Sequence, residues 1–334
     1  MQVTIPEVMQ AVAVDEQSQT LTVRQIPVPQ PGPGQVLIRM AAAPINPSDL
    51  GFAKGSYGTQ KIPYMIPGFE GSGTVVAAGS GLLPRLLVGR RVTCSTLTGG
   101  TWAQYLVVPA RNCFPLSKSL SLEEGAMLIV NPLTAVAFFE IYKQGKHAAI
   151  VNNAAAGALG QMVLRLGRTR NIPVIHVVRR EAQVKLLRSI GAEHVLNNSD
   201  MAFGNQLHQL SHKLKATLIL DPIGGEQTRR LLEVTPSGSL ALVYGSLAGI
   251  KTGPTSQIVG DLTKYVEGFF MPNWLATKNT LQVIGYLSQV QRLAKKELQT
   301  KIQERFPLAQ VQDAVALYQT NPTAGKVLLL GDSA

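Results

Sequence analysis

Cysteine is scarce in this chain, and so are acidic residues. Among 334 residues there are two cysteines, Cys94 and Cys113, and 20 Asp or Glu against 31 Lys or Arg. The cysteines form no C-x-x-C pair, which argues against a disulfide framework and against a structural zinc site built on paired cysteines. We expect both thiols to be buried and to behave as small hydrophobic groups.

Long hydrophobic runs are missing as well. No apolar run reaches the roughly 18 residues that a membrane-spanning helix requires. The first 20 residues contain no Lys or Arg, so no signal or transit peptide is visible. Hydrophobic residues make up 45% and charged residues 15%, which is typical of a globular protein. The length favours two domains. We therefore expect a cytoplasmic protein with no membrane partner.

The excess of basic residues gives a formal net charge of +11. These residues are scattered and form no long basic stripe with interleaved aromatic residues, so we expect no nucleic-acid partner. A positive surface attracts polyanionic small molecules, such as a dinucleotide or an acyl-CoA-like substrate. The alternative is a solvated surface without a specific role.

Residues 147–180 carry the most informative pattern. An apolar run at 147–152 is followed by the spacing A-x-x-G-x-x-G at 154–160 and then by apolar residues at helical intervals. This is a variant of the dinucleotide-binding pattern G-x-G-x-x-G, in which small residues let the backbone turn tightly beside a pyrophosphate. The N-terminus of the following helix presents N–H groups to the phosphates. The predicted phosphate-binding residues are Ala156, Gly157, Ala158, Leu159 and Gly160.

The next predicted strand, at 173–178, runs into Arg179 and Arg180. Sites that prefer NAD place an Asp or Glu about 20 residues after the glycines to bind the ribose 2′-hydroxyl. Arg179 stands in that place, and a guanidinium there binds a 2′-phosphate through paired, charge-assisted hydrogen bonds. The sequence therefore predicts NADPH as the cofactor. A glycine-containing helix start beside a solvated basic turn is the alternative.

The predicted secondary-structure pattern changes near residue 119. Residues 10–117 are rich in short β-like runs, turns and prolines, whereas residues 119–270 alternate between strand and helix patterns. Such alternation is typical of βαβ units and a parallel sheet. The strands are predicted at 148–152, 173–178, 194–197, 216–220 and 239–243.

The C-terminal part predicts a helical stretch after Trp274 that ends near residue 298, a helix after Pro307 and a closing strand at 326–330. The simplest interpretation is that these C-terminal elements belong to the first, β-rich domain. The chain is therefore predicted to be a catalytic domain with a cofactor domain inserted into it.

Several blocks along residues 10–330 carry a family resemblance. They are APINPSD at 43–49, GSYG at 55–58, GTW at 100–102, VNPLTA at 130–135, SIGAEHV at 189–195 and GFFMPNW at 268–274. Together they resemble the zinc-free branch of the medium-chain dehydrogenase/reductase superfamily. Within it, trans-2-enoyl-thioester reductases are most similar and quinone reductases are next.

The resemblance implies an α/β fold with two domains. A GroES-like, β-rich catalytic domain is expected at 1–118 and 275–334. A Rossmann domain, with a doubly wound parallel sheet that binds NADPH, is expected at 119–274. The resemblance also implies a homodimer through the strand at about 265–270, because relatives pair this edge strand across a two-fold axis and Val266, Phe269 and Phe270 are apolar. The alternative is a strand that only closes its own sheet.

Zinc-dependent members of the superfamily bind their metal with an early Cys, a His in a Gly-His-Glu segment and a later Cys or Asp. Here Asn46 lies near the position of the expected Cys, and Phe69 replaces the His. A catalytic zinc needs three protein ligands. The resemblance therefore implies no metal and no activation of the substrate by a Lewis acid.

Tyr57 matches the tyrosine to which enoyl reductases assign the stabilisation of the carbonyl oxygen. Hydride transfer to the β-carbon of an enoyl thioester leaves an enolate, and a neutral hydroxyl donor at that oxygen lowers the barrier. Quinone reductases often have a tyrosine here too, so the reduction of quinones remains an alternative. A packing role for Tyr57 and a non-catalytic, NADPH-binding protein are further alternatives.

Other residues are carried over from the family in the same way, and they fall into two groups. The cofactor contacts are Asn46, Asn131, Thr134, Tyr244, Gly245, Ser246, Phe269, Phe270, Met271 and Lys326. The walls of the substrate pocket are Trp102 and Tyr64, although Trp102 is as well explained by packing.

Overall fold

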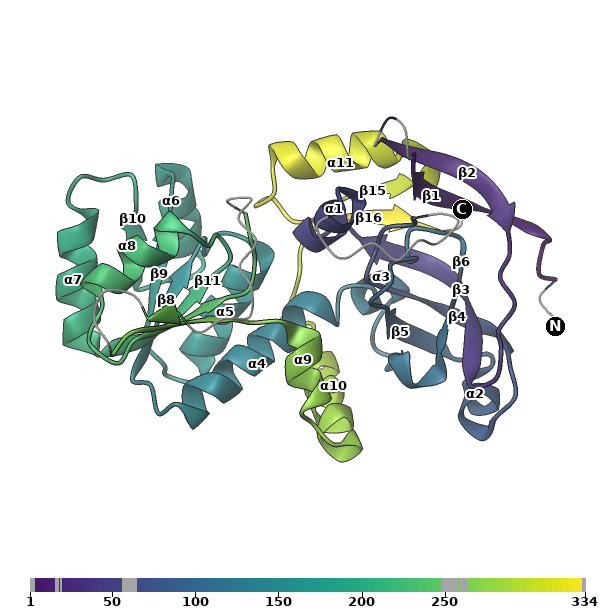
Figure 1. Ribbon diagram of the computed structural model, residues 1–334, viewed down its shortest axis with the longest axis horizontal. Coiled ribbons are helices and arrows are strands. Elements are labelled where there is room, and N and C mark those ends of the chain that lie inside the picture. Colours follow the sequence, from purple (N-terminus) through teal and green to yellow (C-terminus); the bar gives the residue numbers. More distant parts are fainter. Residues whose placement is uncertain are drawn as a thin grey trace. The chain divides into compact units, whose positions relative to one another are not determined.

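The computed structural model describes residues 4–15, 18, 20–55, 65–247, 257–258 and 263–331. The chain divides into two compact units (Figure 1). Unit 1 comprises Met1–Asn131 with Thr300–Ala334, and unit 2 comprises Pro132–Gln299. The predicted domain boundaries, after residues 118 and 274, therefore differ from the observed ones.

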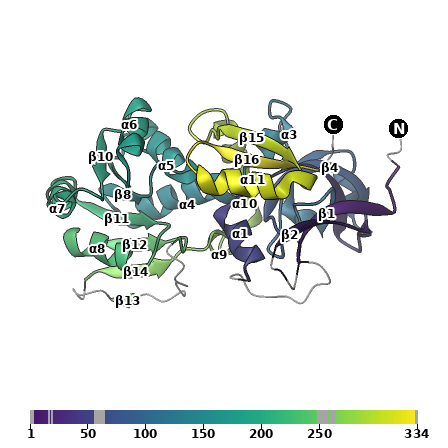
Figure 2. The same ribbon diagram turned by 90° about the horizontal axis from the view of Figure 1, so that it is seen from above.

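Unit 2 contains seven strands that share one sheet. They are β8 (Ala149–Asn153), β9 (Val174–Val178), β10 (His194–Asn197), β11 (Ala216–Asp221), β12 (Leu240–Val243), β13 (Gln257–Ile258) and β14 (Tyr265–Gly268). Their order is β10-β9-β8-β11-β12-β14-β13, as Figure 2 shows, and all pairs are parallel except β13 with β14. The strand order reverses between β8 and β11, and doubly wound sheets bind ligands at the carboxyl ends of such strands.

Helices cover both faces of this sheet. The helices of this part of the chain are α4 (Val130–Gln144), α5 (Ala158–Thr169), α6 (Glu181–Ser189), α7 (Phe203–Leu214), α8 (Glu226–Val234), α9 (Met271–Ala276) and α10 (Thr280–Leu293), and α5 to α8 pack on the sheet. Val177 packs in a core cluster with residues of α7 and α8, whereas Val178 packs in another with residues of α5 and α6. Successive side chains of a strand point to opposite faces, so the two clusters form the two layers. The predicted α/β, doubly wound fold class is confirmed.

Unit 1 is β-rich, and most of its strands form one sheet. They are β1 (Val8–Val14), β2 (Leu21–Pro27), β3 (Gln35–Pro44), β4 (Glu70–Ala78), β5 (Arg91–Ser95), β6 (Tyr105–Pro109), β7 (Cys113–Pro115), β15 (Ile302–Pro307) and β16 (Lys326–Leu330). Seven of them form this sheet. Six follow the order β15-β16-β3-β4-β5-β7, and the seventh, β6, pairs with β3. The C-terminal strands therefore rejoin the first domain, as the sequence predicts.

Short helices complete unit 1. They are α1 (Pro47–Ala53), α2 (Leu82–Leu87), α3 (Leu122–Gly125), α11 (Val311–Thr320) and the 3₁₀ turns η1 (Ala110–Asn112) and η2 (Leu308–Gln310). Figures 1 and 2 show α11 lying across β15 and β16. Its inner face, which includes Val311 and Ala314, packs in one cluster with Val327 and Leu329 of β16.

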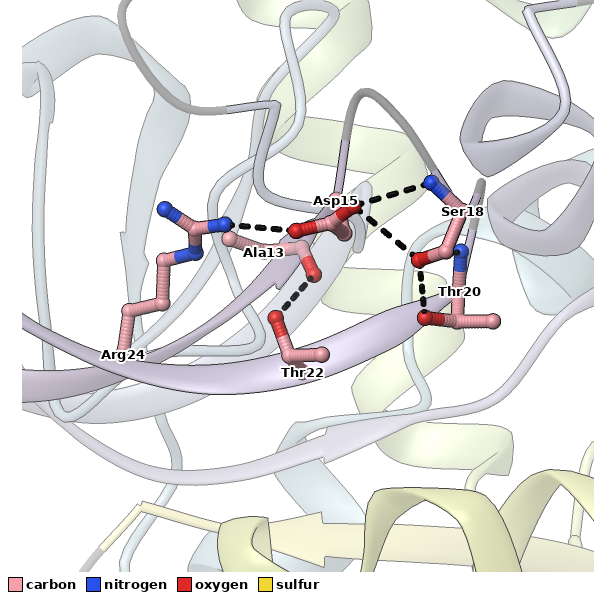
Figure 3. Close-up of polar contacts among 6 residues, drawn as sticks. All are labelled: Ala13, Asp15, Ser18, Thr20, Thr22 and Arg24. Carbon is pink, nitrogen blue, oxygen red and sulfur yellow. Dashed lines mark hydrogen bonds and ion pairs between the residues drawn. The ribbon is translucent and has the colours of Figure 1, made fainter.

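The remaining strands, β1 and β2, form an antiparallel hairpin. Polar contacts hold its end together (Figure 3). Asp15 accepts hydrogen bonds from the N–H and the hydroxyl of Ser18, at 2.9 and 3.0 Å, and pairs with Arg24 at 2.8 Å. Because Asp15 and Arg24 are partly exposed, this ion pair fixes the turn more than it stabilises the fold.

Two segments explain why the observed unit boundaries differ from the predicted ones. Residues 119–131 pack on unit 1, where the carbonyl oxygen of Leu122 accepts the hydroxyl of Ser72. Helix α10 belongs to unit 2, where Tyr286 donates to Glu140 on α4 at 2.7 Å and Lys278, just before α10, donates to the same carboxylate at 2.6 Å. All three contacts are distant in sequence, so local patterns could not predict them.

The predicted dimer requires the strand at 265–270 to lie at the edge of the unit 2 sheet. Among the described strands, β14 is not the edge, because it pairs with β12 on one side and with β13 on the other. The alternative reading of this segment, a strand that closes its own sheet, fits this pairing. A homodimer stays a prediction, and strand pairing would have to involve β13 or the part of β14 that β13 leaves uncovered.

Both cysteines are buried and unpaired, as predicted. Burial raises the pKa of the Cys113 thiol to about 12, so it stays protonated at neutral pH. Across the described ranges, no helix combines the length and the apolar character needed to cross a bilayer.

Candidate cofactor site

The loop between β8 and α5 has the geometry of a phosphate-binding turn. Ala154 has a positive φ of 50°, and Gly157 is the N-cap of α5. No side chain caps this helix, so the N–H groups of its first turn, from Ala158 onward, have no partner within the helix. These groups and the helix dipole favour an anion at this end of α5.

The two glycines of this loop serve different purposes. A Cβ atom on Gly160 would lie 2.5 Å from the carbonyl oxygen of Ala155, so only glycine lets α5 lie this close to the loop. A Cβ atom on Gly157 would meet no atom closer than the carbonyl oxygen of Ala154, at 3.7 Å. The chain therefore leaves space at Gly157 that its own packing does not need. That space and the free N–H groups fit a pyrophosphate.

Two asparagines at the carboxyl end of β8 hold the loop. The amide nitrogen of Asn152 donates to the carbonyl oxygen of Gly160 at 3.0 Å and lies 3.2 Å from Nδ1 of His176. Burial lowers the pKa of His176 to about 3, so the ring is neutral and Nδ1 can accept. Oδ1 of Asn153 accepts the N–H of Ala154 at 2.9 Å, which fixes the residue with positive φ.

Asp221 joins the two strands between which the strand order reverses. Its fully buried carboxylate accepts hydrogen bonds from Nδ2 of Asn153 at 2.9 Å, from the hydroxyl of Thr228 at 2.5 Å and from the N–H of Ile223 at 2.9 Å. A buried carboxylate with several donors is held rigidly. The carboxyl ends of β8 and β11 are therefore held together rigidly.

Arg179 and Arg180 follow β9, and both are exposed. The backbone here is fixed: the N–H of Arg179 donates to Gln183 at 3.1 Å, and its carbonyl oxygen accepts the hydroxyl of Ser199 at 3.0 Å. In the part of the chain that the structure describes, no carboxylate pairs with either guanidinium. Both positive charges are thus available to an anionic group such as a 2′-phosphate.

The segment after β12 lies close to the end of β11. A Cβ atom on Gly245 would lie 2.6 Å from the carbonyl oxygen of Pro222, so glycine is needed for this approach. The ring of Tyr244 lies 5.0 Å from that of Phe138, which in turn lies 5.1 Å from that of Phe269. These distances are typical of packed aromatic pairs. Tyr244 and Phe269 are therefore held in one aromatic group.

The other predicted cofactor contacts of this region differ in exposure. Ser246 and Phe270 are exposed, and Met271, the first residue of α9, is partly buried. Asn131 is partly buried and Thr134 is buried, and both stand in the first turns of α4. Their contacts with a cofactor remain predictions.

A buried polar cluster in unit 1 contains the predicted residues Asn46 and Lys326. The ammonium of Lys326 donates to Oδ1 of Asn46 and, at 3.3 Å, to the carbonyl oxygen of Ile45. Nδ2 of Asn46 donates to Glu70 at 3.0 Å, and Asp49 accepts the N–H of Asn46 at 2.7 Å. Lys326 is 4% exposed, so a cofactor could reach its ammonium only through an opening in this cluster.

The cluster contains two acidic groups, Asp49 and Glu70, and one basic group, Lys326, which affect one another's pKa. Burial raises the pKa of Asp49 to about 7 and also raises the pKa of Glu70, while the nearby ammonium of Lys326 counteracts both shifts. Burial lowers the pKa of Lys326, and the two carboxyl groups counteract that shift. One ammonium thus faces two buried carboxyl groups, and each depends on the others for its charge.

Glu70 also holds the start of α4. Its Oε2 accepts the N–H of Ile129 at 3.0 Å and the N–H of Val130 at 2.9 Å. These are N–H groups at the end of a helix that lack partners along the helix itself. Glu70 therefore holds the backbone directly before Asn131.

The predicted substrate residues are only partly covered by the structure. Trp102 has no exposed surface, belongs to the core of unit 1 and donates its indole N–H to the carbonyl oxygen of Pro44 at 3.3 Å. These contacts are those of a packing residue, which was the alternative. Tyr57 and Tyr64 lie outside the described residues. Among the residues that are described, no three His, Cys, Asp or Glu side chains are grouped to hold a metal.

The sequence patterns did not single out Asn152, Asp221 or Glu70, although each forms hydrogen bonds that hold a segment with predicted cofactor contacts. Asp221 is the last residue of β11, and polar residues at the carboxyl ends of parallel strands are a signal that could have identified it. Nothing local marks Glu70, because its partners lie 24 residues before it and 59 and 60 residues after it.

Comparisons with known proteins agree with this architecture. The family models that match are the alcohol dehydrogenase GroES-like domain, over residues 32–118, and the zinc-binding dehydrogenase, over residues 190–329. The mitochondrial enoyl-[acyl-carrier-protein] reductase of Arabidopsis thaliana is 30% identical over 289 residues, which cover 82% of this chain and 76% of that protein. The synaptic vesicle membrane protein VAT-1 homolog of Rattus norvegicus is 26% identical and covers 90% of this chain and 78% of its own length.

A solved structure gives the same result. A protein of Mesorhizobium loti that carries the name NADPH:quinone reductase has a TM-score of 0.87 and 32% identity, covering 98% of this chain and all of its own. The relatives span both units, and they include an enoyl-[acyl-carrier-protein] reductase and a protein named as a quinone oxidoreductase. The chain therefore belongs to the zinc-free branch of the medium-chain dehydrogenase/reductase superfamily, and it is an oxidoreductase.

Proposed function

We propose that this protein reduces an activated C=C bond with NADPH, and that the substrate is a trans-2-enoyl thioester of CoA or an acyl-carrier protein. The observation that carries the cofactor assignment is the pair of exposed arginines without carboxylate partners, one strand away from an uncapped helix N-terminus with free space at Gly157. The substrate class rests on the similarity to an enoyl-[acyl-carrier-protein] reductase over 82% of the chain.

NADPH, when bound, supplies the hydride. The N–H groups at the start of α5 bind the pyrophosphate, and Arg179 with Arg180 binds the 2′-phosphate. Asn153 and Asp221 link the carboxyl ends of β8 and β11, so that the cofactor would lie against a rigid edge of the sheet. The hydroxyl of Tyr57 donates to the thioester carbonyl oxygen, where negative charge develops as the enolate forms, and the enolate then takes a proton from water at its α-carbon to give the saturated thioester.

Quinone reduction is the second candidate. It is supported by the solved structure named NADPH:quinone reductase, which is 32% identical and covers 98% of this chain. Both candidates use the same cofactor site, so the fold does not separate them. The difference lies in how strongly the reaction depends on a donor at the carbonyl oxygen.

Tyr57→Phe is the variant that separates the two candidates. NADPH oxidation is measured with crotonyl-CoA, a long-chain enoyl-CoA and small quinones, for the wild type and the variant. Removing one such donor typically costs about 10² to 10³ in turnover, so kcat on enoyl-CoA should fall by that factor while NADPH affinity is unchanged. Quinone turnover should fall less, because a quinone can take its protons from water.

The matched control is Tyr265→Phe, which removes a hydroxyl from an exposed tyrosine on β14. It should leave every rate unchanged. If Tyr57→Phe keeps more than about half of the enoyl-CoA turnover, the proposed role of Tyr57 fails. If the wild type reduces quinones but no enoyl thioester, the substrate class is wrong and the second candidate holds.

A further inference from the structure

Unit 1 exposes an unusual group of large apolar side chains on and just after α2. We call it the leucine patch. Its members are Leu82, which is 77% exposed, Leu83 at 48%, Leu86 at 62% and Val88 at 48%. Figure 1 shows α2 at the rim of unit 1. Single exposed apolar residues are ordinary, but four within seven positions are typical of an interaction site.

The helix itself is anchored, so the exposure is not the result of a loose segment. Pro84 and Leu87, three residues apart on one face of α2, are buried, and Leu87 belongs to the core cluster of the sheet. The opposite face carries Leu82 and Leu86. The fold therefore fixes these side chains in an outward position, although exposing them opposes the hydrophobic effect.

The surroundings of the leucine patch are positively charged. Arg85 lies within it, Arg90 follows it, and Arg111 lies on η1, which contacts α2. All three are exposed, and in the described parts of the chain none of them forms an ion pair with a carboxylate. Residues 71–122 contain five basic residues and no Asp or Glu. The patch thus combines outward leucines with uncompensated arginines.

We propose that the leucine patch docks this protein on the surface of an anionic lipid bilayer. Apolar side chains flanked by Lys or Arg bind at the boundary of headgroups and acyl chains, with the cations on the lipid phosphates. This boundary of the bilayer is fluid, so it can accommodate apolar side chains that project from a protein. A protein partner would need a pocket for each leucine, and protein interfaces place their basic residues opposite acidic ones. Docking by six helical residues anchors the protein at the surface without spanning the bilayer.

This function departs from the expectation that the protein has no membrane partner. It is independent of the proposed reaction, because α2 takes no part in the cofactor site. Its consequence is that the enzyme meets apolar substrates where they accumulate, at the lipid surface.

Flotation of the full-length protein with vesicles tests the proposal. The vesicles are phosphatidylcholine alone or phosphatidylcholine mixed with phosphatidylglycerol, at low and at high salt. The wild type should float with the anionic vesicles at low salt, less so at high salt, and poorly with phosphatidylcholine alone. Leu82→Ser with Leu86→Ser should lower the partition coefficient about ten-fold or more. Arg85→Gln with Arg90→Gln should lower it about five-fold for each arginine.

Matched controls exist in unit 2. Leu281→Ser removes a leucine that is 81% exposed on α10, and Lys185→Gln with Lys213→Gln removes two exposed charges. These variants should float like the wild type. All variants should oxidise NADPH at the wild-type rate with a small soluble substrate, which shows that they are folded.

Three results would overturn the proposal. One is a wild type that does not float with anionic vesicles. Another is flotation that the control variants reduce as much as the α2 variants do. The third is self-association in light scattering that Leu82→Ser with Leu86→Ser abolishes, in a protein that does not float, because the leucine patch would then be an interface between copies.

Discussion

Replacing Arg179 and Arg180 together by alanine is expected to weaken NADPH binding by about a hundred-fold or more, because each charge-assisted hydrogen bond contributes about 1.5–3 kcal/mol. Affinity for NADH, which has no 2′-phosphate, should change little. The backbone of this turn is held by Gln183 and Ser199 and not by the guanidinium groups, so the loop should keep its shape. Isothermal titration with both cofactors measures the two affinities.

Lys185→Ala is the control for the loss of positive charge alone. Lys185 is an exposed cation on α6, the helix that follows the arginines, and no ion pair in the described residues involves it. It should lower NADPH affinity only slightly. If the double arginine variant binds NADPH as the wild type does, or loses NADH equally, then Arg179 and Arg180 do not bind the 2′-phosphate.

Glu70→Ala is expected to lower the free energy of unfolding of unit 1 by about 3–5 kcal/mol, because it removes a buried carboxyl group near the ammonium of Lys326 and leaves the amide of Asn46 without its acceptor. The change leaves the ammonium of Lys326 facing Asp49 alone. It also removes the acceptor for the N–H groups of Ile129 and Val130. Each buried donor without a partner adds to the cost.

Urea unfolding in a Trp274→Phe background measures this loss, since Trp102 in unit 1 is then the only tryptophan. Glu123→Ala is the control from the same unit. Glu123 pairs with Arg305 at 2.6 Å on the surface, and such exposed pairs contribute about 0.2–1 kcal/mol. Equal losses for the two variants would show that the buried cluster does not stabilise unit 1.

The order of strands and helices in unit 2 could be read from the sequence because each pattern there is local. The predicted strand at 194–197 agrees with the structure, the strand at 239–243 differs from it by one residue at its start, and the strand at 148–152 is shifted by one residue. Apolar runs of strand length, bounded by glycine or by charged residues, suffice for this. The medium-chain dehydrogenase/reductase family was likewise predicted correctly, because its blocks extend over most of the chain.

The unit boundaries and the buried cluster could not be read in the same way. Tyr286 binds Glu140 across 146 residues, and Lys326 binds Asn46 across 280 residues. Such pairs arise only once the sheets bring distant segments together. The pattern at 154–160 also treated its two glycines alike, whereas only Gly160 is required by packing and Gly157 leaves space beside the helix N-terminus.

The central claim is that the protein transfers a hydride from NADPH to the β-carbon of an enoyl thioester. The most direct measurement uses NADPH with deuterium at both C4 positions, together with an enoyl-CoA, and analyses the product by mass spectrometry. We expect a saturated thioester with one deuterium on the β-carbon, formed with NADPH in strong preference to NADH. A saturated thioester without deuterium, or the reduction of quinones with no saturated thioester at all, would contradict it.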